Sequence, residues 1–142
     1  MPTYRAPMRS RRDDVDPALA VRRALDLGLC GIGGVLRRSP STLPDAVSAT
    51  ADEHGPRAAD RLARFAAADD GDTVWTRDEH GLFHVGELAG SWGYDDDPRA
   101  VGADLVHVRR CRWRTPDDAV PGPVLATFGR GGRNFQRIRA LP

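Results

Sequence analysis

The fold of this chain is decided by residues 71–94, which read GDTVWTRDEHGLFHVGELAGSWGY. Residues 73–76 follow a Gly-Asp turn and combine β-branched and aromatic side chains, a composition typical of a strand. A polar turn that ends at Gly81 comes next, and a second strand follows it as far as Leu88. The stretch therefore predicts a β-hairpin.

The exit of this hairpin carries Trp92 and Tyr94 on a loop flanked by glycines. Loops lie at the surface, and large rings exposed there commonly contact a ligand or a partner. Glu87 is the only acid in the second strand. It is either a base or hydrogen-bond acceptor for a bound ring, or an ordinary exposed strand residue.

Helices are predicted before the hairpin and strands after it. Asp16 and Pro17 form a good helix start, and Gly28 suits the C-terminal cap of that helix. Further helices are expected over residues 46–54 and 57–68, and strands over 29–36, 104–114 and 124–128, with a short closing element over 134–138.

This order of elements favours an α+β fold with a small, mostly antiparallel, barrel-like sheet and about three helices. Residues 1–15 are predicted to be an irregular basic lead-in, and residues 16–142 to form one domain. No apolar run approaches the roughly 20 residues that a membrane span requires, and no apolar segment follows the N-terminal arginines. We therefore expect a cytoplasmic protein without a membrane partner.

The charge is unevenly distributed along the chain. All 21 basic residues are arginines, and the net charge is +1. Residues 1–68 carry 11 arginines and 8 acids, residues 69–104 carry 2 and 10, and residues 105–142 carry 8 and 2. These segments are either solvated faces of mixed sign or, at the C-terminus, a basic surface for an anionic polymer.

No pattern of reactive side chains indicates catalysis. The four histidines are scattered, and neither a phosphate-binding glycine loop nor a nucleophile elbow occurs. Cys111 beside His107 could be a nucleophile, although a small buried cysteine is the commoner role. Cys30 and Cys111 are too few and too far apart for a metal cluster, so we expect neither a metal nor a cofactor.

The aromatic residues indicate binding instead. Three tryptophans and Tyr94 lie in the sheet half of the chain, near an arginine-rich strand. Aromatic walls for stacking, polar groups for base edges and guanidinium groups for phosphates are what a site for an unstacked base requires. Packing in the core is the alternative for Trp75 and Trp113.

The order of the motifs resembles the PUA-like superfamily, in its EVE/YTH-like branch found in bacterial modification-dependent restriction and defence proteins. The matching motifs are Gly31-Ile32-Gly33, VGELAGSWGY at 85–94, ADLVHVR at 103–109 with CRW at 111–113, and FQRI at 135–138. The family often carries a tryptophan where this chain has Gly34, so a pocket here would be wider or differently built.

The resemblance implies a reader module for nucleic acid, DNA or RNA, which accepts a flipped or single-stranded and modified base and performs no catalysis. It places the base pocket at Ile32, Gly33, Trp92, Tyr94, Arg109 and Trp113. It places phosphate contacts at Arg130 and Arg133. A protein partner in a defence system is also compatible with it.

Two other functions remain open from the sequence. One is a small hydrolase of modified nucleosides, as in the related ASCH branch, although the absence of lysine argues against that version. The other is a protein-interaction subunit that uses the acidic face of the hairpin.

Overall fold

The predicted hairpin is present in the structure, a computed structural model that describes residues 2–139. Strands β3 (Thr73–Arg77) and β4 (Phe83–Leu88) pair antiparallel, with Trp75 opposite Val85. The Asp78 carboxylate holds the turn, because it accepts hydrogen bonds of 2.9 Å from the backbone N–H groups of His80 and Leu82.

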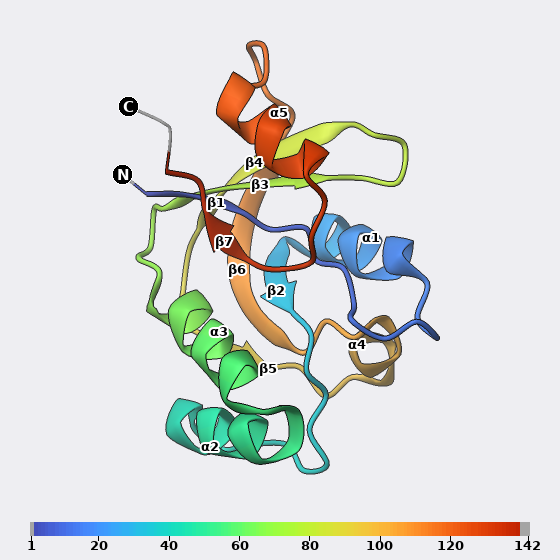
Figure 1. Cartoon of the computed structure of the whole chain (residues 1–142), viewed down its shortest axis with the longest axis vertical. Coiled ribbons are helices and arrows are strands. Elements are labelled where there is room, and N and C mark those ends of the chain that lie inside the picture. The colour runs from blue at the N-terminus through green and yellow to red at the C-terminus, as the bar shows by residue number, and fades with distance from the viewer. Residues whose placement is uncertain (1, 140–142) are drawn as a thin grey trace.

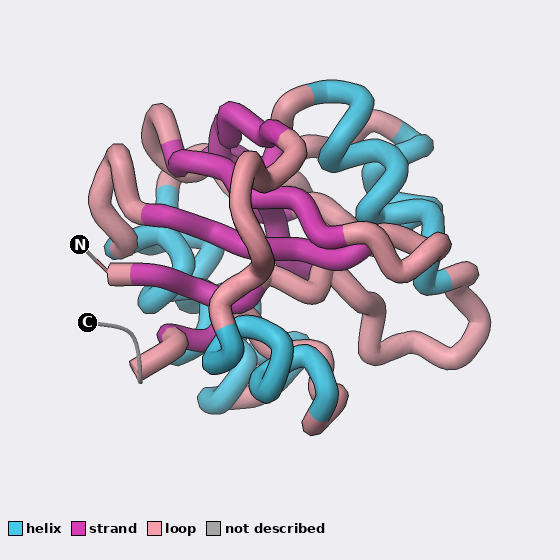
Figure 2. The backbone as a smooth tube through the Cα atoms, turned by 90° about the horizontal axis from the view of Figure 1, so that it is seen from above, coloured by secondary structure: helices cyan, strands magenta, loops and turns pink. Residues whose placement is uncertain are grey.

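The strands form a curled, mixed half-barrel sheet in the order β2-β6-β4-β3-β1-β7 (Figures 1 and 2). Strand β6 is its spine, because β2 and β4 both pair with it, and so does β5 off this path. The bounds of the remaining strands are β1 (Thr3–Arg5), β2 (Leu29–Ile32), β5 (Gly93–Tyr94), β6 (His107–Arg114) and β7 (Gln136–Arg137).

The sheet is mixed and not only antiparallel, because β1 and β3 form a parallel pair that was not predicted. Strand β1 lies within the lead-in that was predicted to be irregular, runs parallel to β3 and pairs antiparallel with β7. Its three residues are too few to show an alternating pattern in the sequence. The two described ends of the chain consequently lie side by side at one edge of the sheet (Figure 1).

The structure contains five helices among the described residues, where the sequence predicted about three. Their bounds are α1 (Pro17–Leu27), α2 (Leu43–His54), α3 (Pro56–Ala67), α4 (Pro98–Ala103) and α5 (Gly122–Gly129). The short α4 was not predicted, and α5 replaces the strand expected at 124–128. Val124, Thr127 and Phe128 are buried whereas Leu125 and Ala126 are exposed, a helical spacing that the alternation of a strand cannot reproduce.

The helix caps follow the sequence at α1 and differ at α2. Asp16 accepts a hydrogen bond from the backbone N–H of Ala18, and Gly28 ends the helix as predicted. Helix α2 begins earlier than predicted, because Thr42, and not Asp45, is its N-cap. No helix within residues 2–139 is long and apolar enough to cross a membrane.

The core has two parts, which lie on opposite faces of the sheet at β3, because its adjacent residues Val74 and Trp75 belong to different parts. The larger lies among α1, α3 and the central strands, with Phe65, Val74, Leu88 and Leu105 fully buried. The smaller lies between the hairpin and α5 and includes Trp75, Val85, Val124 and Phe128.

One arginine connects these elements. The Arg109 side chain on β6 is 3% exposed, and its guanidinium donates to the carbonyls of Phe65, Ala68 and Gly90 and to the Asp70 carboxylate. The Asp70 side chain is largely exposed, so the three backbone acceptors carry most of this interaction. Arg109 therefore fixes the end of α3 to the sheet.

We expect Arg109→Met to lower the free energy of unfolding by about 3 kcal/mol, because three buried carbonyls lose their donor. The matched control is Arg112→Met on the same strand. The Arg112 side chain is 72% exposed and contacts only Glu87, so about 0.5 kcal/mol is expected there. Urea unfolding of both variants measures the difference, and equal losses would contradict the structural role assigned to Arg109.

Candidate functional site

A cavity of about 420 Å³ opens where α2, α3, the segment after β2 and the N-terminal segment meet. This volume falls in the range of small-ligand sites. Apolar side chains from three separate elements, Ile32, Leu62 and Phe135, line it together with the backbone of Gly33 and Gly34.

The floor of the cavity depends on two glycines that allow close packing. A Cβ atom on Gly31 would lie 2.6 Å from the carbonyl oxygen of His107 on β6. A Cβ on Gly33 would lie 2.6 Å from the carboxylate of Asp104. That carboxylate accepts hydrogen bonds from the Ser10 hydroxyl at 2.5 Å and the Gly34 N–H at 2.9 Å. Both glycines are therefore required by close neighbours within the protein.

His107 forms part of the wall and is held in one neutral tautomer. Its Nδ1 accepts a hydrogen bond from the Trp92 indole N–H at 3.1 Å, and its Nε2 therefore donates to the carbonyl of Gly34 at 3.2 Å. The residue is 1% exposed, and this burial lowers the pKa of His107 from 6.5 to about 4. Neither ring nitrogen is left to accept a proton from a ligand.

The rim of the cavity is strongly basic. Its charged lining residues are one acid, Asp104, and five arginines: Arg9, Arg11, Arg12, Arg61 and Arg133. Arg12 pairs with exposed Asp14, whereas Arg9 and Arg61 have no carboxylate within 4.0 Å in residues 2–139. Burial, followed by repulsion from Arg11, Arg64 and Arg57, lowers the pKa of Arg61. The site therefore favours an anionic ligand.

A hydroxyl beside the cavity has no partner in the described part of the chain. Thr50 on α2 is 3% exposed and lines the cavity, and its covered Oγ1 has no hydrogen-bond partner among residues 2–139. Leaving a buried polar group unpaired costs about 1–3 kcal/mol. Rotation about χ1 would turn this hydroxyl toward the cavity, where a ligand can supply the missing donor or acceptor.

The structure gathers three of the predicted site residues at this cavity, namely Ile32, Gly33 and Arg133. Trp92 and Tyr94 stand behind its wall and do not line it. The Trp92 indole bonds to His107, and the Tyr94 ring meets His107 edge-on at 5.3 Å.

The other predicted site residues lie elsewhere. Arg109 is in the core, as described above. The Trp113 indole N–H donates to the carbonyl of Leu29 at 2.7 Å and its ring packs on the larger core cluster. Arg130 is exposed just beyond α5, outside the cavity.

Sequence reasoning missed Thr50, His54, Arg61, Asp104 and Phe135, all of which line the cavity. A threonine inside a helix carries no signal of its own. The glycines of Gly31-x-Gly33 gave an indirect signal, because glycine within a strand often marks a place where another group packs closely. Asp104 is one of the groups that pack against them.

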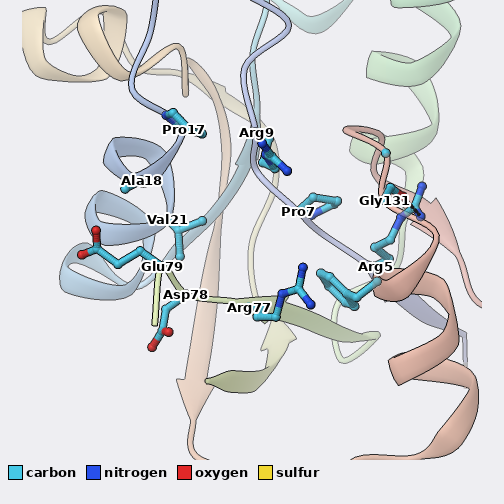
Figure 3. A pocket seen from close by; sticks show the side chains of 12 residues that line it. Arg5, Pro7, Arg9, Pro17, Ala18, Val21, Arg77, Asp78, Glu79 and Gly131 are labelled. Atoms are coloured by element: carbon cyan, nitrogen blue, oxygen red, sulfur yellow. Dashed lines mark hydrogen bonds between the residues drawn. The ribbon is translucent and has the colours of Figure 1, made fainter. Parts of the chain in front are cut away.

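A second cavity of about 300 Å³ lies between the hairpin, α1 and α5 (Figure 3). Arg9 lines both cavities. Three arginines, Arg5, Arg9 and Arg77, line the second cavity together with Asp78 and Glu79, and the Arg5 guanidinium already donates to acceptors in residues 127–136. Its mixed charge makes it a weaker candidate for an anionic ligand.

No family model, curated protein or solved structure matches this chain. The resemblance that the motifs suggest therefore stays an expectation. Within residues 2–139, no group of three or more His, Cys, Asp or Glu side chains is placed to hold a metal ion.

The low pKa of His107 predicts acid sensitivity. Below pH 6.5 the unfolded chain binds a proton that the folded protein takes up only near pH 4. The free energy of unfolding should therefore fall as the pH drops through this window, by about 2 kcal/mol from His107 between pH 7 and pH 5.

Urea unfolding of the wild-type protein and of His107→Gln at several pH values measures this contribution. The wild type should lose more stability than the variant over the same window. His80→Gln is the control, because His80 is exposed on the hairpin turn, and it should behave like the wild type. Parallel curves for wild type and His107→Gln would show that His107 is not the group responsible.

Proposed function

We propose that this protein binds nucleic acid and reads a flipped or single-stranded, modified base in the 420 Å³ cavity. The observation that carries the proposal is a cavity rimmed by five arginines, beside the Thr50 hydroxyl that is covered and has no partner within residues 2–139. The cavity offers guanidinium groups to a phosphate, and rotation of the Thr50 side chain would offer a hydroxyl to a base edge.

The lining supplies the surfaces that a base needs. Phe135 is a flat wall, and its orientation is fixed because it stacks on Tyr4 at 4.6 Å and meets Phe65 edge-on at 5.1 Å. Ile32 and Leu62 add apolar contact area. A hydroxyl both donates and accepts, so Thr50 can pair with either kind of polar group on the base. Stacking and edge recognition together are typical of single-stranded sites.

Gly34 leaves room for a substituent on the base. It lines the cavity with a backbone φ of 118°, a conformation that residues with side chains rarely adopt. The wall is therefore bare next to His107, where a Cβ would stand 3.5 Å from the imidazole Nε2. A modified base carries extra atoms, and this bare wall is compatible with them.

The same geometry favours reading over hydrolysis. Both nitrogens of His107 and both oxygens of Asp104 already have partners within the protein. Burial raises the pKa of the Cys111 thiol, so the reactive thiolate is disfavoured. None of these groups is free to act as the general base that a nucleoside hydrolase requires.

Thr50→Val tests the proposal. Because the Thr50 hydroxyl is unpaired without a ligand, its removal should leave the fold as stable as before, or more so. The preference for a modified over an unmodified oligonucleotide should fall about five- to thirty-fold, as expected for the loss of one or two hydrogen bonds. Fluorescence anisotropy measures it, over strands with methylated, hydroxymethylated or acetylated cytosine or methylated adenine.

Thr76→Val is the matched control. Thr76 is also fully buried with a partnerless Oγ1, but it lies in β3 and does not line the cavity. It should leave the preference unchanged. The proposal fails if no DNA or RNA strand binds at low salt, or if both valine variants affect the preference alike.

A further inference from the structure

A basic groove of about 590 Å³ adjoins the candidate base cavity, between α3 and the segment 134–139. It shares Arg61, Asn134 and Phe135 with that cavity, so the two hollows adjoin at these residues. The function proposed above does not use this groove.

The groove collects positive charge. Five arginines line it, with Asp60 as the one acid: Arg57, Arg61, Arg64, Arg137 and Arg139. In the part of the chain that the structure describes, none of the five has a carboxylate within 4.0 Å. Within residues 2–139, the guanidinium groups of the groove therefore have no close counter-charge.

The spacing of the three arginines on α3 indicates that they do not stabilise this helix. Arg57, Arg61 and Arg64 occupy positions i, i+4 and i+7 of α3, along one stripe about 10 Å long. Like charges at such positions destabilise a helix. A neighbouring stripe of α3 buries Leu62 and Phe65 in the core, which already accounts for the packing of this helix.

We propose that this groove holds the phosphodiester backbone of the strand whose base enters the adjoining cavity, an inference that rests on the function proposed above. Guanidinium forks match phosphate oxygens, and a row of them suits a chain of regularly spaced anions. Because the groove adjoins a cavity of the size of a base, a polynucleotide fits the two sites together better than an acidic peptide does. The large exposed apolar side chains, such as Leu82 and Leu125, lie outside the groove.

The groove is tested with a double variant, Arg57→Gln and Arg64→Gln, which spares Arg61 because that residue also lines the base cavity. Binding is measured by anisotropy with labelled DNA and RNA strands of about ten nucleotides, unmodified and modified. The expected result is about tenfold weaker binding of all strands near 0.1 M salt. The slope of log affinity against log salt should also become shallower by about 1.4, since each lost phosphate contact on a single strand contributes about 0.7.

The charge-matched control is Arg38→Gln with Arg99→Gln. Both residues are exposed, and neither lines any of the three cavities. This control should retain wild-type affinity and salt slope. If control and groove variants weaken binding equally, net charge explains the effect and the groove has no special role.

The outcomes separate this inference from the function on which it rests. The groove variant should lower affinity for all strands and leave the preference for the modified base intact, whereas Thr50→Val should do the reverse. If the groove variant loses affinity but Thr50→Val leaves the preference for the modified base unchanged, the proposed base recognition is wrong and the groove assignment still holds. Wild-type binding by the groove variant, or equal competition by a poly-glutamate peptide of matched charge, would overturn the groove assignment.

Discussion

The arrangement of α3 against the sheet depends on the buried guanidinium of Arg109. Its acceptors come from three separate stretches of the chain, which are the end of α3, the turn at residue 70 and the loop at residue 90. A buried cation tolerates little displacement, because losing any acceptor leaves it poorly solvated. The position of α3 sets one wall of the 420 Å³ cavity and one side of the basic groove. Both candidate sites therefore depend on Arg109, although Arg109 lines neither of them.

The aromatic loop after the hairpin supports the site without lining it. Trp92 orients His107, and His107 bonds to the backbone at Gly34, so the rings act on the cavity through one imidazole. This arrangement resembles the support that outer residues give to metal ligands, in which a hydrogen bond to one ring nitrogen fixes the function of the other. Trp92 thereby supports the wall, and a ligand would meet Phe135, Gly33 and Gly34 instead.

Local chemistry made the hairpin, the caps of α1 and the alternation of β6 predictable from the sequence. His107, Arg109 and Cys111 face inward as the two-residue period requires. The same reasoning misread 124–128, where β-branched and aromatic residues sit in helix α5, because burial at i and i+4 outweighs strand propensity there. Half of the cavity was invisible in the sequence, since Thr50, Arg61 and Asp104 meet only through tertiary packing.

The pairing of β1 with β7 constrains the order in which this fold can assemble. Residues 3–5 leave the ribosome well before residues 127–136, which hold the acceptors described for the Arg5 side chain, and before residues 136–137, the outer partner of β1. Contacts of such long sequence separation form slowly. A nascent chain must therefore carry an unpaired strand edge and a hydrated Arg5 until residues 127–137 have been synthesised. In that interval the edge can recruit a foreign strand, which makes this protein a candidate client for chaperones during translation.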